Sequence, residues 1–311
     1  MEISFRKRDH YAQNECLRVM EHKSGFVNII GNPNVGKSTL LNSLIGTKLS
    51  IITPKAQTTR HRIHGIVNGE DYQVIFSDTP GILNPKYKLQ ETMLNVVKSA
   101  ISDADVIIYV TDVFENIDLT DDLTKTLNRG NIPVILVLNK IDKSEQAAVE
   151  KILEGWSKIL PAAKMLPVSA LENFNLDGLF KMILEYLPVS PAYYPKDELT
   201  DKSERFFAAE ILREKLLINY REEIPYAVEV EIESFKEDAR LIKIRAIIYV
   251  ERDSQKGIII GNKGSAIKKA GTEARLEMEK FFDKRIFLEI FVKVKKDWRS
   301  DEAMLKGFGY R

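Results

Sequence analysis

Short apolar runs alternate with longer segments of helical periodicity between Phe26 and Leu187. This alternation is typical of a mostly parallel β-sheet with helices on both of its faces. Two of the runs, residues 106–110 and 134–138, are apolar throughout, as expected for central strands. We predict six strands, over residues 26–30, 62–68, 72–78, 106–112, 134–139 and 165–168. We predict helices over residues 37–45, 89–101, 119–129, 145–159 and 176–186.

The pattern changes where Pro188, Pro191 and Pro195 follow one another closely. A stretch so rich in proline fits neither a helix nor a central strand. We therefore predict a semi-rigid linker over residues 188–200 that separates residues 23–187 from a second domain, residues 201–311.

The second domain is expected to open with a helix, because Asp201-Lys202-Ser203-Glu204 has the composition of a helix N-terminus. Strands are predicted over residues 226–235, 241–251 and 286–295, with two helices between the second and the third. The resulting order, α-β-β-α-α-β, indicates a small α+β domain.

The composition limits the class of protein but does not indicate a function. The chain has 311 residues, 44% hydrophobic and 29% charged, which is ordinary for a globular protein with two cores. A single cysteine, Cys16, excludes an internal disulfide framework and fits a reducing compartment. No apolar run approaches the roughly 18 residues of a membrane span. Residues 1–22 mix acids and bases, so we expect a frayed extension, with Met20 as an alternative start.

One stretch between the first strand and the first helix carries the strongest chemical signal. It has the G-x-x-x-x-G-K-[ST] spacing of a phosphate-binding loop, in the strand-loop-helix context that this motif requires. We expect its backbone N–H groups to surround a phosphate, Lys37 to bridge the β- and γ-phosphates, and Ser38 to bind Mg²⁺. The expected nucleotide-binding residues are Gly31, Asn32, Pro33, Asn34, Val35, Gly36, Lys37, Ser38 and Thr39.

Three further segments follow predicted strands, where ligands of open α/β sheets collect. In Asp78-Thr79-Pro80-Gly81, the carboxylate of Asp78 is expected to hold Mg²⁺ and the Gly81 N–H to approach the γ-phosphate. In Asn139-Lys140-Ile141-Asp142, a carboxylate at Asp142 suits the two donors of guanine, which adenine lacks. Asn139 would brace the loop, and the Lys140 stem would lie over the base. The third segment, Ser169-Ala170-Leu171, is expected to meet guanine O6.

A basic segment between the first helix and the second strand is a candidate switch. A threonine hydroxyl there would complete the Mg²⁺ shell when a γ-phosphate is present, and motif placement favours Thr59 over Thr58. We therefore assign Lys37, Thr59 and Gly81 to catalysis, and Ser38, Thr59 and Asp78 to the metal. Ile82 follows Gly81, so no glutamine orients the attacking water at that position, and we expect slow intrinsic hydrolysis.

The second domain contains a Gly-x-x-Gly loop between its two later helices. Such a loop lets a sugar-phosphate backbone lie against helix N-termini while bases cross an apolar groove. Trp298 was a candidate for base stacking, the alternative being a buried cap on the core. The candidate RNA-binding residues are Ile258, Ile260, Gly261, Asn262, Lys263, Gly264, Lys268, Lys269, Lys293, Lys295, Trp298 and Arg299.

Together these motifs resemble the Era family of GTPases, from about Lys23 to the C-terminus. The resemblance implies a Ras-like P-loop GTPase domain followed by a type II K-homology (KH) domain. It implies that GTP/GDP and Mg²⁺ are the cofactors, that the KH domain binds the 3′ end of 16S rRNA, and that the protein acts in 30S ribosomal subunit assembly. It also implies a cytoplasmic monomer, with peripheral inner-membrane contact allowed. Asn34 matches the position that holds K⁺ in related GTPases.

Two departures from the family pattern affect details only. Asn32 stands where the family usually has arginine, and Asn262 where lysine is common. Two other functions fit the same motifs: an RNA-binding protein whose GTP site is structural, and a tRNA-modification GTPase. The second is disfavoured because no cysteine follows the GTPase domain. A membrane-remodelling GTPase would need long helical stalks, for which this chain has no room.

Overall fold

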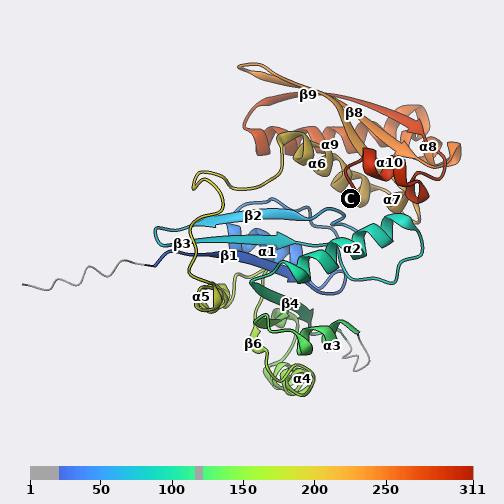
Figure 1. The fold of residues 1–311 in the computed structure, drawn as a ribbon. Coiled ribbons are helices and arrows are strands. Elements are labelled where there is room, and N and C mark those ends of the chain that lie inside the picture. The colour runs from blue at the N-terminus through green and yellow to red at the C-terminus, as the bar shows by residue number, and fades with distance from the viewer. Residues whose placement is uncertain (1–20, 116–121, 311) are drawn as a thin grey trace, which may run out of the picture.

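A computed structural model describes residues 21–115 and 122–310. The extension predicted for residues 1–22 lies outside the described residues except for its last two, and so does the start of the helix predicted over residues 119–129. The described chain forms two domains, the N-terminal one below the C-terminal one in Figure 1. Each domain has its own apolar core.

The N-terminal domain is built on a six-stranded sheet with the order β2-β3-β1-β4-β5-β6. All neighbouring strands are parallel except β2 and β3, whose short connection allows only an antiparallel pair. The mostly parallel α/β fold is therefore confirmed. The strands are β1 (Lys23–Ile30), β2 (Ile63–Asn68), β3 (Tyr72–Asp78), β4 (Val106–Asp112), β5 (Val134–Asn139) and β6 (Lys164–Pro167).

Helices cover both faces of this sheet. Leu40 of α1 and Leu179 of α5 belong to the apolar cluster on one face, and Val97 of α2 and Trp156 of α4 belong to the cluster on the other. Two-sided burial explains why β4 and β5 are apolar along their whole length. The helices are α1 (Lys37–Ile45), α2 (Lys88–Ser102), α3 (Asp122–Arg129), α4 (Gln146–Ile159) and α5 (Leu176–Tyr186), with a short η1 (Ile141–Lys143).

The strand register brings polar residues to one edge of the sheet. Asp78 ends β3 opposite Ile29 of β1, and Asp112 ends β4 opposite Asn139, the last residue of β5. Because these strands are parallel, their carboxyl ends meet at the same edge, where the loop between β1 and α1 also begins.

The proline-rich linker is fixed to the N-terminal domain. The Ile66 N–H of edge strand β2 donates to the carbonyl of Leu199 at 2.9 Å. The backbone N–H groups of Tyr193 and Tyr194 donate to Gln73 Oε1 at 2.7 and 2.9 Å. The linker therefore continues along the edge of the first sheet before the second domain starts.

The C-terminal domain packs helices on one face of a three-stranded sheet with the order β7-β8-β9. Strands β8 and β9 are parallel, while β7 and β8 are antiparallel. The predicted order is present with two short additions, α7 and α10. Residues 226–227 belong to α7 rather than to a strand, because Pro225 opens a helical turn there. The elements are α6 (Glu204–Asn219), α7 (Ile224–Ala227), β7 (Glu229–Glu237), β8 (Leu241–Val250), α8 (Asp253–Ile260), η2 (Asn262–Gly264), α9 (Ser265–Phe282), β9 (Arg285–Val294), η3 (Trp298–Ser300) and α10 (Glu302–Gly307).

The end of the chain returns to the first domain. Trp298 and Leu305, from the last two helical segments, form one apolar cluster with Leu89 and Met93 of α2. The two domains are therefore joined by a packed contact as well as by the linker.

Candidate functional site

The predicted phosphate-binding loop connects β1 to α1, as its motif requires. Gly36 has φ 98°, and a side chain at this position would come within 2.2 Å of Asn139 Nδ2, so only glycine fits. Lys37 is 6% exposed, and its ammonium donates to the Asn32 carbonyl at 2.8 Å. Burial lowers the pKa of Lys37 to about 8. A buried cation beside a ring of backbone N–H groups is a binding site for a phosphate.

Three oxygen-bearing side chains converge beside this loop. The hydroxyls of Ser38 and Thr59 donate to Asp78 Oδ2 at 2.7 and 3.1 Å, and they lie 3.0 Å from each other. Asp78 is fully buried, its Oδ1 has no hydrogen-bond partner among the described residues, and burial raises its pKa. A buried carboxylate with an unpaired oxygen, next to two hydroxyls, fits a hard divalent cation such as Mg²⁺.

The structure separates the two candidate switch threonines. The Thr58 hydroxyl lies 2.6 Å from Thr53 Oγ1 and donates to the Lys55 carbonyl, so it is engaged within its own loop. Thr59 alone of the two reaches Asp78. The geometry therefore favours Thr59 as the metal ligand.

The Asp78-Thr79-Pro80-Gly81 turn is held against the phosphate loop. The Thr79 hydroxyl donates to the Ile29 carbonyl at 2.7 Å, which fixes the turn to β1. A side chain at Gly81 would come within 2.8 Å of Pro33 Cα, so the close approach again requires glycine. Ile82 packs against the apolar cluster of the second face, and its side chain cannot orient a water molecule.

The predicted base-recognition residues meet at the ends of β5 and β6. Asn139 braces the phosphate loop by donating to the Val35 carbonyl, and it accepts the Ala170 N–H at 3.0 Å. Ser169 Oγ donates to Asp142 Oδ1 at 2.6 Å, which lowers the pKa of Asp142. Asp142 is therefore an ionised acceptor, as recognition of guanine requires. Leu171 is 67% exposed beside this loop.

Sequence reasoning did not identify Asp112 as part of this site. Its Oδ2 accepts from the Lys140 ammonium at 2.6 Å, and the same ammonium donates to the Asn34 carbonyl at 2.6 Å. Asp112 thus orients the lysine that is expected to lie over the base. Its position at the end of an apolar strand was a signal that could have revealed it.

A cavity of about 270 Å³ lies beside the phosphate loop and the candidate metal ligands Ser38 and Thr59. Its walls come from the phosphate loop, the segment of residues 51–59, Gly81 and Lys140. The cavity therefore covers the phosphate and metal part of the candidate site, while Asp78, Asn139, Asp142 and residues 169–171 do not line it.

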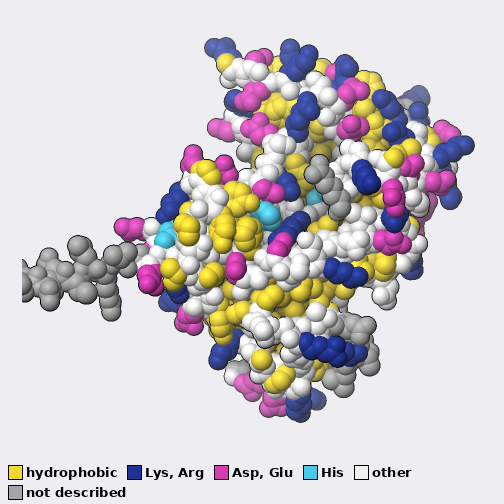
Figure 2. Space-filling view, viewed as in Figure 1, with side chains coloured by type: hydrophobic (Ala, Val, Ile, Leu, Met, Phe, Trp, Pro, Cys, Tyr) yellow, Lys and Arg dark blue, Asp and Glu magenta, His cyan; other side chains and the backbone are white. Residues whose placement is uncertain are grey.

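In the second domain, the Gly-x-x-Gly loop is exposed and cationic. Gly261 and Gly264 have φ values of 72° and 78°, which let the chain turn sharply between α8 and α9. The side chains of Asn262, Lys263, Lys268 and Lys269 are exposed, and Ile258 is 52% exposed. Ile260, the last residue of α8, is partly buried beside them. In the space-filling view, Lys and Arg side chains recur over the upper half of the molecule, interspersed with Asp and Glu and with apolar side chains (Figure 2).

A groove of about 270 Å³ lies between α9, the helix that follows this loop, and the edge strand β9. Most of its lining was not identified from the sequence. The signal that could have found Gly271 is its place on the face of α9 nearest β9, where a side chain would come within 2.7 Å of Ile290 Cδ1. The lining residues are Ile267, Lys268, Gly271, Thr272, Arg275, Leu288 and Ile290.

The prediction for Trp298 as a base-stacking residue is wrong for this structure. Its side chain is fully buried, and the indole N–H donates to the Ala227 carbonyl at 3.1 Å. Arg299 is paired with Glu251 and lies over the Tyr87 ring of the first domain. The buried Trp298 is therefore not available for base stacking, and Arg299 is engaged in contacts with Glu251 and Tyr87.

Lys293 and Lys295 are also separated from the loop. The apolar residues of β9 that alternate with them pack against the helices, so both lysines lie on the opposite face of the sheet. Lys293 is 4.0 Å from Glu233, and the Lys295 ammonium lies 5.2 Å from the centre of the Tyr249 ring. The predicted positive field is therefore divided between two faces.

Comparison with known proteins identifies both domains. Residues 26–140 match the family described as 50S ribosome-binding GTPase, and residues 223–299 match the KH domain. GTPase Era of Clostridium kluyveri is 46% identical and matches over 93% of this chain and 99% of its own. The chain belongs to the Era family of GTPases. GTPase Era of Staphylococcus haemolyticus is 44% identical over 93% of this chain and 98% of its own length.

Two solved Era structures support the same conclusion. Era in complex with MgGDPNP and nucleotides 1506–1542 of 16S ribosomal RNA has a TM-score of 0.89 and 42% identity, covering 93% of this chain and 99% of that one. A variant of Aquifex aeolicus Era bound to GDP·AlF₄⁻ has a TM-score of 0.87 and 41% identity, with the same coverage. The Era-family chain described here therefore has a GTP-hydrolysing domain followed by a KH domain.

Proposed function

We propose that this Era-family GTPase binds the 3′ end of 16S rRNA through its KH domain, under the control of its nucleotide state, and serves 30S subunit maturation. The observation that carries the proposal is the groove between α9 and β9, lined by Lys268 and Arg275 as well as by apolar residues, on the helix that follows the exposed Gly-x-x-Gly loop. A narrow apolar groove flanked by cations accepts single-stranded bases while the phosphates lie along the cations. The structure of the related Era with nucleotides 1506–1542 of 16S ribosomal RNA supports the choice of this RNA as the ligand.

In the nucleotide site, each residue has a role that follows from its position. Lys37 lies where it can neutralise the β- and γ-phosphates, and Gly81 leaves room for its N–H to meet the γ-phosphate. Ser38, Thr59 and Asp78 would hold Mg²⁺, which supplies the positive charge that the phosphoryl transfer requires. Because Ile82 cannot orient water, the element that does so must come from elsewhere in the chain or from a partner.

A monovalent cation is a further part of the proposal. Asn34 has φ 66°, its side chain is exposed at the mouth of the phosphate loop, and its carbonyl already accepts from Lys140. An amide oxygen in this place can hold K⁺ next to the phosphates, where an added positive charge stabilises the transition state. GTP hydrolysis should therefore be faster in K⁺ than in Na⁺ buffer, and equal rates would exclude this role.

The proposal includes action in the cytoplasm as a monomer. Peripheral contact with the inner membrane stays a prediction of the family resemblance. Within residues 21–115 and 122–310, no helix combines the length and the apolar character needed to cross a bilayer.

The test is calorimetry of the full chain with an oligonucleotide from the 3′ end of 16S rRNA. The titration is made with nucleotide-free protein, with GDP and with Mg²⁺–GDPNP. We expect the tightest binding in the GDPNP form, and a scrambled oligonucleotide of the same composition serves as the control. Equal affinity in all three forms would show that the domains are independent modules. No binding in any form would defeat the assignment of RNA.

A further inference from the structure

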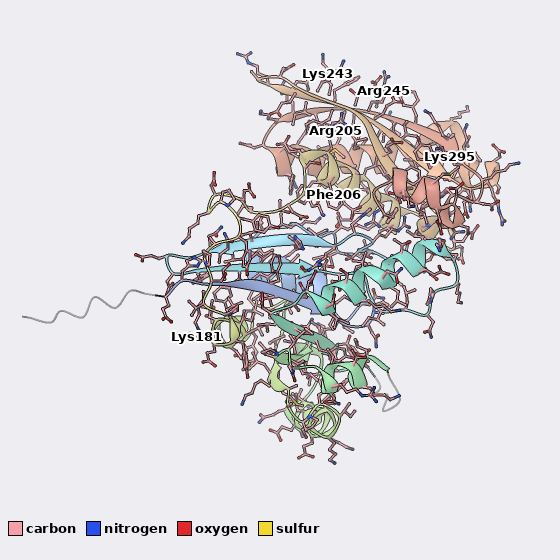
Figure 3. The ribbon with its side chains drawn as sticks, viewed as in Figure 1. Lys181, Arg205, Phe206, Lys243, Arg245 and Lys295 are labelled. Carbon is pink, nitrogen blue, oxygen red and sulfur yellow. The ribbon has the colours of Figure 1, made fainter. Side chains whose placement is uncertain are left out.

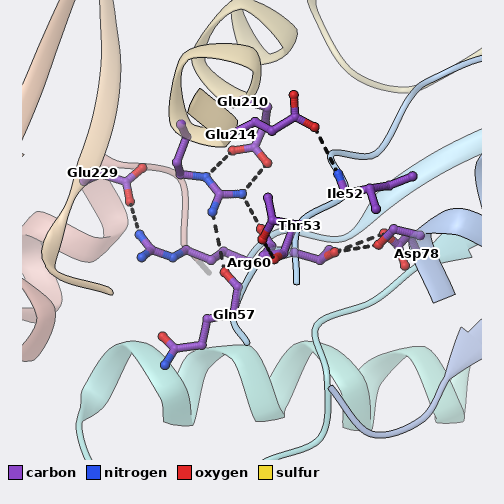
Figure 4. A network of polar contacts seen from close by, with 12 residues as sticks. Ile52, Thr53, Gln57, Arg60, Asp78, Glu210, Glu214 and Glu229 are labelled. Atoms are coloured by element: carbon purple, nitrogen blue, oxygen red, sulfur yellow. Dashed lines mark hydrogen bonds and ion pairs between the residues drawn. The ribbon is translucent and has the colours of Figure 1, made fainter. Parts of the chain in front are cut away.

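The segment that carries Thr59 is held from the KH domain on both sides of that residue. On the N-terminal side, the guanidinium of Arg213 in α6 donates to the carbonyls of Thr58 and Gln57, the longer of these bonds being 3.5 Å. On the C-terminal side, Arg60 reaches out of the first domain into the second (Figure 4). Thr59 itself faces Asp78 and Ser38 in the metal site.

Among the described residues, every hydrogen bond of the Arg60 side chain is with the KH domain. Its Nη1 donates to the Val228 carbonyl at 2.7 Å and to Glu229 Oε2 at 3.0 Å. Its Nη2 reaches the carbonyls of Pro225 and Tyr226 at 3.3 and 3.4 Å. Because adjacent Cα atoms are about 3.8 Å apart, fixing the residues before and after Thr59 leaves its backbone little freedom to move.

Both guanidinium groups are almost completely buried. The side chain of Arg60 is 0% exposed and that of Arg213 is 1% exposed, and their carboxylate partners Glu229 and Glu210 are 6% and 7% exposed. Burial would raise the pKa of Glu210, but the Arg213 charge lowers it below its ordinary value. Buried pairs of this kind have little tolerance for altered geometry, because moving one partner leaves an unpaired charge in the interior.

We propose that Arg213 and Glu229 of the KH domain are positioning residues for the metal ligand Thr59, so that the GTP-specific half of the metal site is assembled by both domains. This inference rests on the proposed function and extends it. Ser38 and Asp78 are fixed within the first domain, whereas Thr59 depends on the second. By linkage, whatever changes the docking of the KH domain changes the affinity for the triphosphate, and the reverse holds to the same extent.

Other contacts attach the chain just before Thr59 to α6. The Ile52 N–H donates to Glu214 Oε1 at 3.2 Å, and the Lys48 ammonium binds Glu214 Oε2 at 2.9 Å. The Lys55 ammonium donates to the carbonyls of Leu217 and Tyr220 at the end of the helix. The wall of the nucleotide cavity formed by residues 51–59 is thus attached to α6 at several points along its length.

The test removes the positioning contact and both charges of the buried Glu210–Arg213 pair together, so that neither charge is left without its partner. In the double variant Glu210→Gln/Arg213→Gln, both charges disappear and the shorter side chain at position 213 no longer reaches the Thr58 carbonyl. Binding of Mg²⁺–GDPNP and of Mg²⁺–GDP to the full-length protein is measured with fluorescent analogues of each nucleotide. We expect GDPNP affinity to fall about tenfold while GDP affinity stays within about twofold, since Thr59 serves only the triphosphate form.

A matched control makes the same chemical change at the surface of the same helix. Glu204 and Arg205 are both exposed in the first turn of α6, and Figure 3 shows Arg205 there. Glu204→Gln/Arg205→Gln should leave both affinities unchanged. Glu229→Gln keeps the side-chain shape but leaves the buried Arg60 charge without its ionised partner, so we expect a shift in the same direction together with a loss of folding stability, which chemical denaturation measures.

Hydrogen exchange gives a readout that is independent of nucleotide affinity. In the Glu210→Gln/Arg213→Gln variant, the amides of residues 57–60 should exchange faster, while those of β3 should not change. Equal GDPNP and GDP affinities to the parent, with unchanged exchange, would overturn the inference. Loss of both nucleotides to the same degree would also overturn it, because that is the result of general destabilisation. Failure of the parent protein to bind the rRNA oligonucleotide would instead defeat the proposed function.

Discussion

The nucleotide site and the KH groove are built in opposite ways. Four polar side chains of the nucleotide site are buried: Lys37, Asp78, Asn139 and Ser169 are all at most 6% exposed, and each takes part in a hydrogen bond within the site. In the KH domain, Lys268 of the groove is exposed, and so are Ile258 and Lys263, which precede it in the sequence. A pre-formed buried site recognises one ligand and fails abruptly when altered, whereas an exposed strip of cations binds in graded steps.

The largest effect is expected for Lys37→Ala. This change removes the buried cation from the β/γ-phosphates, and truncation of a buried charge partner costs about 2–5 kcal/mol, or roughly 30- to several thousand-fold in affinity. Equilibrium binding of GDPNP measures it, with Lys181→Ala on the exposed face of α5 as the control. Unchanged affinity would contradict the whole assignment of the phosphate loop.

The same lysine predicts a pH dependence. Burial lowers the pKa of Lys37 to about 8, whereas bound phosphates keep it protonated. The nucleotide-free protein therefore loses this proton as the pH rises through 8. We expect affinity for the triphosphate to fall above pH 8, by at most about tenfold per pH unit, and to be nearly constant between pH 6 and 7. Titrations of GDPNP affinity between pH 6 and 9 measure this change.

The next largest effect concerns the choice of base. Asp142→Asn replaces an ionised acceptor with an amide, and a hydrogen bond to a charged group contributes about 1.5–3 kcal/mol. GTP affinity should fall roughly 10- to 150-fold, and xanthosine triphosphate should bind better than it does to the parent protein. Competition binding with both nucleotides measures the switch, and Asp177→Asn, an exposed acid of α5, is the control. Retained preference for GTP would show that another group recognises the base.

A smaller effect, on RNA affinity, is expected for a change in the Gly-x-x-Gly loop of the KH domain. Lys263→Glu reverses one exposed charge of the Gly-x-x-Gly loop, and we expect RNA affinity to fall about tenfold. The slope of log affinity against log salt should become shallower by about 0.7, because one phosphate contact is lost. Lys181→Glu makes the same change in net charge on the far side of the first domain (Figure 3). If both variants weaken RNA binding equally, only the overall charge matters and the groove is not the site.

Local patterns were sufficient to predict the fold and to place the candidate nucleotide residues at one edge of the sheet. Strands β3, β4 and β5 have the predicted bounds, because an apolar run between two polar ends has few other interpretations in a covered sheet. Asp78 and Asn139 could be assigned because parallel strands bring their last residues together. The contacts of Arg213 with Thr58 could not be predicted, since they join residues far apart in sequence across a domain boundary.

The prediction for Trp298 was wrong because the local sequence does not show long-range packing. A tryptophan among lysines resembles a base-stacking residue, but the C-terminal segment folds back over the sheet and against α2, which the local sequence does not show. Tyr310, near the end of that segment, donates to Glu229 Oε2 at 2.7 Å and stacks on His61 at 4.3 Å. The segment therefore belongs to the interface between the domains.

The smallest expected effect on RNA binding follows from this correction. Trp298→Phe removes the indole N–H bond to the Ala227 carbonyl and part of the buried ring, which should cost about 1–3 kcal/mol of folding stability. Chemical denaturation measures that loss, and RNA affinity of the folded variant should equal that of the parent. Phe291→Leu, a change at an exposed ring on the outer face of β9, is the control and should have little effect on stability. A large loss of RNA affinity with unchanged stability would mean that Trp298 moves out of the core and contacts the RNA. The exposed groove would then be only part of the RNA-binding site.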